Sequence, residues 1–189
     1  PISQGFPDFE TVKFFTGKYF QKYNFLPVFY DIETTGLSRY STFVYLIGAV
    51  KWEQNQWILT QWLGESPEEE ALIIREFTNY LQDSTYTIQY NGDRFDQPYL
   101  EERCRKNELP SPFEGLASID VYQVLKSCQS LFKLSRMKQP DLENLFPSMH
   151  RIYCDGGQCI RLYRSYMKKK DPKALETVLG HNQEDLHGL

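Results

Sequence analysis

The sequence has no apolar run long enough to cross a membrane as a helix. Its longest uncharged apolar stretch, from Thr42 to Val50, is far shorter than the roughly 20 residues that a membrane-spanning helix needs. The first residues also lack the basic and apolar segments of a secretory signal. We therefore expect a cytoplasmic protein with no membrane partner. Its 189 residues, of which 41% are hydrophobic and 24% are charged, are typical of one globular domain.

Cysteine pairs and phosphate-binding glycine motifs are also absent. The four cysteines form no C-x-x-C pair, and Cys154 and Cys159 lack nearby partners for a zinc site, so we expect reduced thiols. No G-x-G-x-x-G and no G-x-x-x-x-G-K-[ST] follows a strand-like segment, which excludes a Rossmann or P-loop nucleotide-binding fold. There is no internal repeat.

Positive charge is not in excess. The net charge is -4 and the isoelectric point is about 5.5. A general basic nucleic-acid-binding domain would have an isoelectric point above about 9, so that class is disfavoured. A metal nuclease is not excluded, because such a site gathers several carboxylates whose charge only the metals neutralise. A set of four such acids would account for the whole negative excess.

Apolar periodicity predicts an α/β domain with the order β-β-β-α-β-α-β followed by helices. This order implies a mixed sheet flanked by helices. The predicted strands are 28–33, 43–52, 57–63 and 86–90, with 118–122 as a fifth strand or a helix start. One predicted helix begins at Pro67, and the others cover 96–106, 141–146, 157–169 and 172 to the end. We expect residues 1–26 to form an arm or helix packed on a domain of residues 27–189, and the natural protein to continue into a further C-terminal segment.

Two acids close the first predicted strand. Asp31 and Glu33 are two residues apart, so their side chains point to the same face, while Ile32 faces the opposite side into the core. Like charges side by side are unfavourable unless a cation lies between them, and hard cations such as Mg²⁺ prefer oxygen ligands. The alternative is a strand end that emerges into water with two acids that bind nothing.

A third acid follows the fourth strand, within Asn91-Gly92-Asp93-Arg94-Phe95-Asp96. Asp96 suits the N-cap of the next helix, and capping alone would be a sufficient structural reason for it. In an open α/β sheet, however, sites assemble at the carboxyl ends of the strands. Asp93 is the rival acid, and its place beside Gly92 suits a turn better than a ligand.

The last helix carries His181 and Asp185, which are one turn apart on the same face. A histidine beside a metal-ligating carboxylate is suited to general-base catalysis. The alternative is a helix with a solvated polar face. Taken together, the four acids and the histidine supply what two-metal phosphoryl chemistry requires.

These three segments resemble, in order, the motifs of the DEDD exonuclease superfamily, which includes the proofreading domains of DNA polymerases and several 3′→5′ RNA exonucleases. The resemblance spans residue 28 to the C-terminus and is greatest to the bacterial YprB-like branch. The segments that carry it are Asp31-Ile32-Glu33-Thr34-Thr35-Gly36, Tyr90-Asn91-Gly92 before Phe95-Asp96, Gly180-His181-Asn182 before Asp185, and Leu46-Ile47-Gly48.

The resemblance implies a ribonuclease-H-like mixed sheet of about five strands and two divalent cations, Mg²⁺ or Mn²⁺. It implies that Asp31, Glu33, Asp96 and Asp185 ligate metal, that His181 orients or deprotonates water, and that Thr34, Leu37 and Asn91 lie near the substrate end. One feature departs from the family pattern. His-type members place the histidine five residues before the last Asp and Tyr-type members place a tyrosine four before, whereas here a histidine lies four before.

The leading hypothesis is a metal-dependent nuclease, specifically a 3′→5′ exonuclease on single-stranded DNA or RNA. One alternative is a structure-selective endonuclease on the same fold. Another is an inactive domain that binds nucleic acid or a protein partner. Two further features have a structural and a functional interpretation: Asp120 as a spare site acid, and the basic residues Arg161, Arg164 and 168–170 as phosphate contacts or a solvated face.

Overall fold

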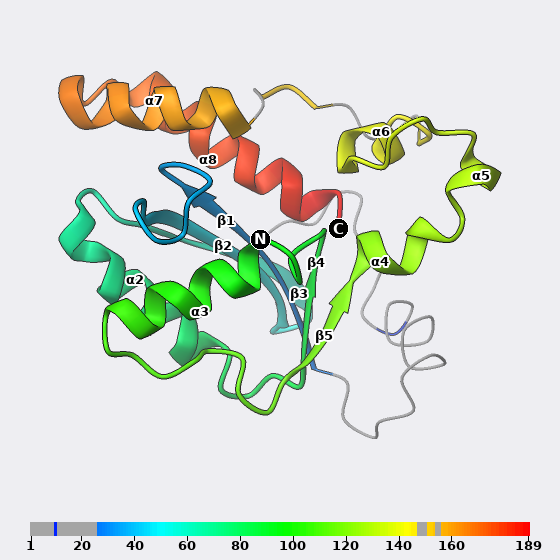
Figure 1. Cartoon of the computed structure of the whole chain (residues 1–189), viewed down its shortest axis with the longest axis horizontal. Coiled ribbons are helices and arrows are strands. Elements are labelled where there is room, and N and C mark those ends of the chain that lie inside the picture. The colour runs from blue at the N-terminus through cyan, green and yellow to red at the C-terminus, as the bar shows by residue number, and fades with distance from the viewer. Residues whose placement is uncertain (1–9, 11–25, 147–150, 154–155) are drawn as a thin grey trace.

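A five-stranded sheet forms the centre of the molecule in the computed structural model, which describes residues 10, 26–146, 151–153 and 156–189 (Figure 1). The arm or helix predicted over residues 1–26 lies outside the described residues, apart from Glu10 and Leu26. The strand order is β3-β2-β1-β4-β5. The predicted ribonuclease-H-like mixed sheet of about five strands, flanked by helices, is therefore confirmed.

The sheet is mixed because its two halves are connected differently. A hairpin joins β2 (Val44–Glu53) to β3 (Gln56–Leu63), and β2 also runs antiparallel to β1 (Pro27–Thr34). Gln54 and Asn55 form its turn, both with positive φ (50° and 61°). The other neighbours, β4 (Tyr86–Gln89) and β5 (Ala117–Asp120), are parallel to β1 and to each other. The carboxyl ends of β1, β4 and β5 therefore meet at one edge of the sheet.

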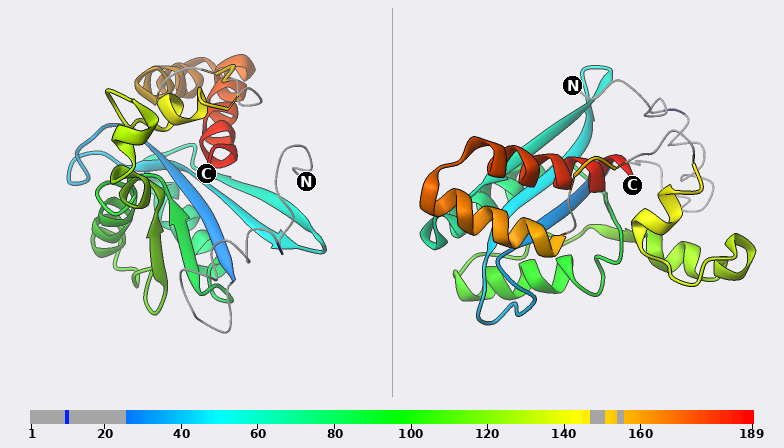
Figure 2. Two further views of the ribbon diagram at one scale, coloured as in Figure 1. Left: turned by 90° about the vertical axis from the view of Figure 1, so that its right-hand side faces the viewer. Right: turned by 90° about the horizontal axis from the view of Figure 1, so that it is seen from above.

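Helices cover both faces of the sheet (Figures 1 and 2). On one face, α2 (Glu70–Tyr80) and α3 (Asp96–Lys106) bury apolar side chains with Val28, Tyr30 and Ile32 of β1. On the other face, α7 (Gly156–Lys169) and α8 (Pro172–His187) pack against β2 and β1. Alternate residues of β1 thus face different helix layers, which follows from the two-residue period of a strand.

A buried ion pair fastens α2 to α3. The carboxylate of Glu70 accepts two hydrogen bonds from the guanidinium of Arg103, at 2.8 and 2.6 Å, and both side chains are almost fully buried. It also accepts from the backbone N–H of Val44 at 2.8 Å and from the side-chain amide of Asn107 at 3.1 Å. Its oxygens are thus well satisfied, as a buried charge requires.

The observed elements differ from the predicted ones mainly between the fifth strand and α7. Both interpretations of residues 118–122 hold, because β5 ends at Asp120 and α4 (Val121–Lys126) follows directly. The short helix α5 (Gln129–Phe132) was not predicted, and the helix expected over 141–146 is α6 (Gln139–Glu143). The helix expected from Pro67 begins with a 3-10 turn, η1 (Pro67–Glu69). Cys104 and Cys128 carry free thiols.

Among the described residues, none of the helices has the length and apolar character required to span a bilayer.

Candidate active site

The acid pair of β1 faces the helix layer formed by α7 and α8. Ile32 packs into the core on the opposite face, as the alternation predicts. Asp31 accepts a hydrogen bond at 2.9 Å from the side-chain amide of Asn182 on α8. Glu33 is 6% exposed and accepts at 3.4 Å from the hydroxyl of Tyr45, on the neighbouring strand β2. Both carboxylates are therefore held in place by neighbours and do not emerge freely into water.

Helix α8 brings Asp185 and His181 to the same place. Oxygen atoms of Asp31, Glu33 and Asp185, one from each, all lie within 4.8 Å of one another. The Nε2 atom of His181 lies 3.2 Å from Asp185 Oδ2 and 3.6 Å from Glu33 Oε1. His181 and Asp185 are thus on one face of the helix, as the four-residue spacing predicts. The interpretation of this segment as a solvated polar face is wrong, because His181 is only 7% exposed.

Asp96 joins this group from α3, and it does not cap that helix, which was the structural alternative for this acid. The N-cap residue is Phe95, and Asp96 is the first residue of the helix. Its carboxylate accepts a hydrogen bond at 3.3 Å from the backbone N–H of Ile32, between the two acids of β1. A tertiary contact with β1 therefore takes the place of the local capping bond that the sequence also allowed. Asp96 lies outside the group of three acids with mutual approach within 4.8 Å, but it is 6% exposed and directed at the same strand.

Burial and repulsion from neighbouring acids raise the pKa values of Asp31, Glu33 and Asp96. Burial raises the pKa of Asp31 and that of Glu33 well above their usual ranges, and repulsion from Asp185 and Asp96 adds to both shifts. Burial likewise raises the pKa of Asp96 to about 7, although its backbone hydrogen bonds oppose the shift. Such mutual repulsion in a buried place favours either protonation or a bound cation.

Arg151 supplies positive charge at the rim of the cluster. Its guanidinium lies 2.5 Å from Asp185 Oδ1 and also binds both oxygens of Glu143, at 2.6 and 2.7 Å. Sequence reasoning missed this residue, because it lies 34 positions from Asp185 in a segment without periodicity. No local signal could have placed it there.

Asn182 is a second residue that sequence reasoning assigned no role. It is fully buried; it donates to Asp31 Oδ2 and accepts from the side chain of Gln61 at 2.8 Å. It fits because Gly48, which pairs with Asp31 across the sheet, has no side chain: a Cβ there would lie 2.0 Å from Asn182 Oδ1. The Gly48 of the Leu46-Ile47-Gly48 segment therefore leaves room for the amide that orients Asp31.

Cys159 of α7 also borders the cluster. Its sulfur lies within 4.8 Å of ligand atoms of Glu33 and His181, and all three residues are buried. The carboxylate Glu33 thus belongs to two possible ligand groups, one with oxygen atoms only and one that mixes oxygen, nitrogen and sulfur. The oxygen-only group matches a hard cation such as Mg²⁺ or Mn²⁺.

The three predicted substrate contacts, Thr34, Leu37 and Asn91, differ in exposure and in their partners. The Thr34 hydroxyl donates to the carbonyl of Gly36 at 2.9 Å, and the Thr34 residue is 6% exposed. In contrast, Leu37 is 85% exposed on the β1–β2 loop, where its side chain is open to contact. Asn91 has a positive φ of 59°, and its backbone N–H donates to Asp120 at 2.8 Å.

The two other acids near this edge serve the fold. Asp120 caps α4 through the N–H of Gln123, in addition to its bond to Asn91, so its structural interpretation is supported. Asp93 accepts from Gln89 at 2.9 Å and from Ser118 at 2.5 Å. Both acids therefore have fold partners of their own, as the turn position of Asp93 suggested.

Comparisons with known proteins agree with this fold. The model of the RNase_H superfamily matches residues 28–189. The uncharacterized protein YprB of Bacillus subtilis (strain 168) is 26% identical over 167 residues, which cover 85% of this chain and 39% of YprB. This chain therefore spans about two fifths of the length of that relative.

Two solved structures share the fold at low sequence identity. The family B DNA polymerase of the archaeon Pyrobaculum calidifontis has a TM-score of 0.70 at 17% identity, over 87% of this chain and 23% of the polymerase. Exonuclease I of E. coli in complex with a dT13 oligonucleotide has a TM-score of 0.56 at 15% identity, over 88% of this chain and 46% of the exonuclease. At these identities, the likeness extends to the fold alone.

Proposed function

The chain belongs to the RNase_H superfamily, and on that premise we propose that it is a divalent-metal-dependent nuclease that hydrolyses phosphodiester bonds of nucleic acid. The observation that carries this proposal is the mutual approach, within 4.8 Å, of oxygen atoms of Asp31, Glu33 and Asp185. The convergence of three buried or half-buried acids from two distant segments does not stabilise the fold, because their mutual repulsion opposes folding. We further propose the finer activity of a 3′→5′ exonuclease on single-stranded DNA or RNA.

The acids fit a pair of Mg²⁺ or Mn²⁺ ions. Asp31, Glu33, Asp96 and Asp185 would hold them, because they offer only carboxylate oxygens. Bound cations would also offset the repulsion that, together with burial, raises the pKa values of Asp31, Glu33 and Asp96. When bound, such cations supply the Lewis acidity that activates water and stabilises the leaving oxygen. Asn182 fixes the position of Asp31, and Tyr45 that of Glu33.

His181 is proposed to receive the proton of the attacking water. Its Nε2 atom faces Asp185 and Glu33 at 3.2 and 3.6 Å, so a positive charge formed on the ring would lie beside two carboxylates. The ring is held by burial, which keeps it directed at the acids. The helical spacing of four residues from Asp185 is sufficient to bring it there, although related His-type enzymes use five.

A single strand is the proposed substrate. The fold is shared with Exonuclease I, whose structure includes a dT13 oligonucleotide, and the charge balance of this chain disfavours a broad basic surface for a duplex. Thr34, Leu37 and Asn91 are proposed to lie near the terminal nucleotide. The exposed Leu37 is suited to pack against a base or sugar.

The test is degradation of end-labelled single-stranded DNA and RNA with Mg²⁺, Mn²⁺ or EDTA. We expect stepwise shortening from the 3′ end that needs metal and is lost in Asp31→Asn. The matched control is Asp83→Asn, which makes the same chemical change at an exposed acid outside the cluster and should leave the rate unchanged. Equal rates for the two variants would contradict the proposed role of the acids.

Two other outcomes would point to the alternative functions. Internal cuts in a 5′-labelled strand would indicate an endonuclease on the same fold. Binding of the strands without cleavage, under all metal conditions, would indicate a domain that binds nucleic acid and has lost catalysis.

A further inference from the structure

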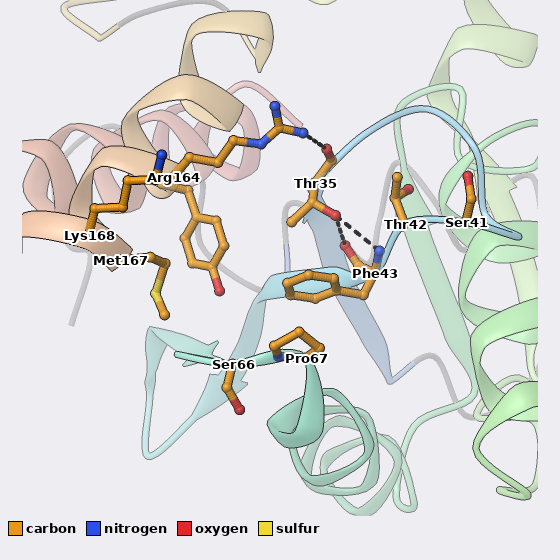
Figure 3. Close-up of a pocket in the computed structure, with 10 residues that line it drawn as sticks. Thr35, Ser41, Thr42, Phe43, Ser66, Pro67, Arg164, Met167 and Lys168 are labelled. Carbon is orange, nitrogen blue, oxygen red and sulfur yellow. Dashed lines mark hydrogen bonds between the residues drawn. The ribbon is translucent and has the colours of Figure 1, made fainter.

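A pocket of about 460 Å³ lies between α7, the β1–β2 loop and η1 (Figure 3). None of the four acids lines it. Its volume is within the range of roughly 300–1,000 Å³ that is typical of small-molecule sites. The residues that matter for its chemistry are Thr35, Phe43, Pro67, Arg164, Met167 and Lys168.

The separation between the pocket and the acid cluster follows from the residue spacing along two chain segments. Thr35 comes directly after β1 and follows Glu33 by two residues, which is roughly 7 Å in extended chain. On α7, Arg164 follows Cys159 by five residues, about 7.5 Å along the helix axis. The sulfur of Cys159 lies within 4.8 Å of ligand atoms of Glu33 and His181. The pocket therefore begins at a distance on the scale of a single nucleotide from the acids.

The polar wall of the pocket is cationic. Arg164 and Lys168 are exposed and one turn apart on the same face of α7. The guanidinium of Arg164 is fixed by a 3.0 Å hydrogen bond from Nη2 to the carbonyl of Thr35 (Figure 3). A guanidinium has five N–H donors, so this bond orients the group and leaves donors for an anion.

The other wall is apolar. Phe43 and Met167 line the pocket and are half-buried, and Pro67 lies near them. An aromatic ring and a thioether present a surface against which any of the bases can pack. Cations on one side and apolar groups on the other match the two halves of a nucleotide, its phosphate and its base.

We propose that this pocket binds one nucleotide of the substrate strand, adjacent to the nucleotide whose phosphodiester bond is cut. Arg164 and Lys168 contact the phosphate, while Phe43 and Met167 pack against the base. This inference rests on the proposed nuclease function and adds to it a specific path, on which the strand leaves the acids along α7. The contacts read no base edge, so the subsite accepts any sequence.

The test is equilibrium binding of a fluorescent dT8 oligonucleotide in EDTA, measured by anisotropy. The double variant Arg164→Ala/Lys168→Ala should raise Kd about tenfold, since charge-assisted hydrogen bonds to a phosphate are lost. The slope of log affinity against log salt should also fall by about 0.7, the contribution of one phosphate of a single strand. Because both side chains are exposed, the variant should fold, and circular dichroism checks this.

The matched control is Arg161→Ala/Lys169→Ala. It removes the same charge from the same helix at two exposed residues that do not line the pocket, so Kd should change less than twofold. Equal losses in the two double variants would overturn the subsite, because they would reflect general charge. Absence of measurable binding by the unchanged protein would also overturn it.

Cleavage assays separate this inference from the proposed function. If the unchanged protein degrades the strand but both double variants bind alike, the nuclease stands and the subsite is wrong. If only the pocket variant loses affinity but no metal supports cleavage, the pocket binds nucleic acid and the nuclease function fails. In an active enzyme, we expect the pocket variant to raise KM more than it lowers kcat, as loss of binding contacts does.

Discussion

The buried position of Asp96 predicts that the protein without metal loses stability as pH rises. Burial raises the pKa of this carboxyl to about 7 in the folded protein, whereas in the unfolded chain it is near 3.9. Between these values the folded state keeps a proton that the unfolded state has lost. The stabilisation is therefore full below about pH 4 and is lost as pH rises through about 7.

The magnitude follows from the size of the shift. Three pKa units correspond to a free energy on the order of 4 kcal/mol, of which about 2–3 kcal/mol should be lost between pH 5 and pH 8. Asp31 and Glu33 act in the same direction, because burial and repulsion raise their pKa values too. Loss of this size is a large share of the stability of an ordinary domain.

The assay is urea unfolding in EDTA at four pH values from 5 to 8, with tryptophan fluorescence as the measure of unfolding. The comparison is Asp96→Asn, which cannot ionise but whose side-chain oxygen can still accept from the N–H of Ile32. The difference in unfolding free energy between variant and unchanged protein should grow with pH. If the difference in unfolding free energy were the same at pH 5 and pH 8, the raised pKa of Asp96 in the folded protein would be refuted. Addition of Mg²⁺ at pH 8 should recover part of the lost stability.

Three further changes test separate contacts. His181→Ala should lower kcat by about 10²–10⁴-fold, because the proton acceptor is lost, and an unchanged rate would remove it from the mechanism. Gly48→Ala should weaken Mn²⁺ binding measured by calorimetry, since the added Cβ displaces Asn182 from the acid it orients, and unchanged affinity would contradict that role. Arg103→Met should cost about 3–5 kcal/mol in urea unfolding by leaving Glu70 buried without its partner, and a cost below 1 kcal/mol would contradict the pairing.

The sequence alone determined the architecture and the main acids, because both depend on short-range patterns. Apolar periodicity is local, and it predicted the strands of the sheet and the principal helices. Spacing of two residues on a strand was sufficient to put Asp31 and Glu33 on one face, and spacing of four on a helix put His181 beside Asp185. The short helix α5 was missed because its four residues carry too little periodicity.

Only the tertiary structure decided how these segments meet. The local sequence allowed Asp96 to be a helix cap, but the strand order places the start of α3 against β1, so its carboxylate accepts from the N–H of Ile32 instead. The residues around the acids come from distant parts of the sequence: Arg151 lies 34 positions from Asp185, and Asn182 lies 151 positions from Asp31. Cys159 approaches Glu33 from α7. No periodicity of the sequence encodes such approaches. The pocket beside α7 likewise exists only because three separate elements enclose it. Contacts between distant segments are fixed by packing of the whole domain, and for that reason they could not be predicted from any one segment.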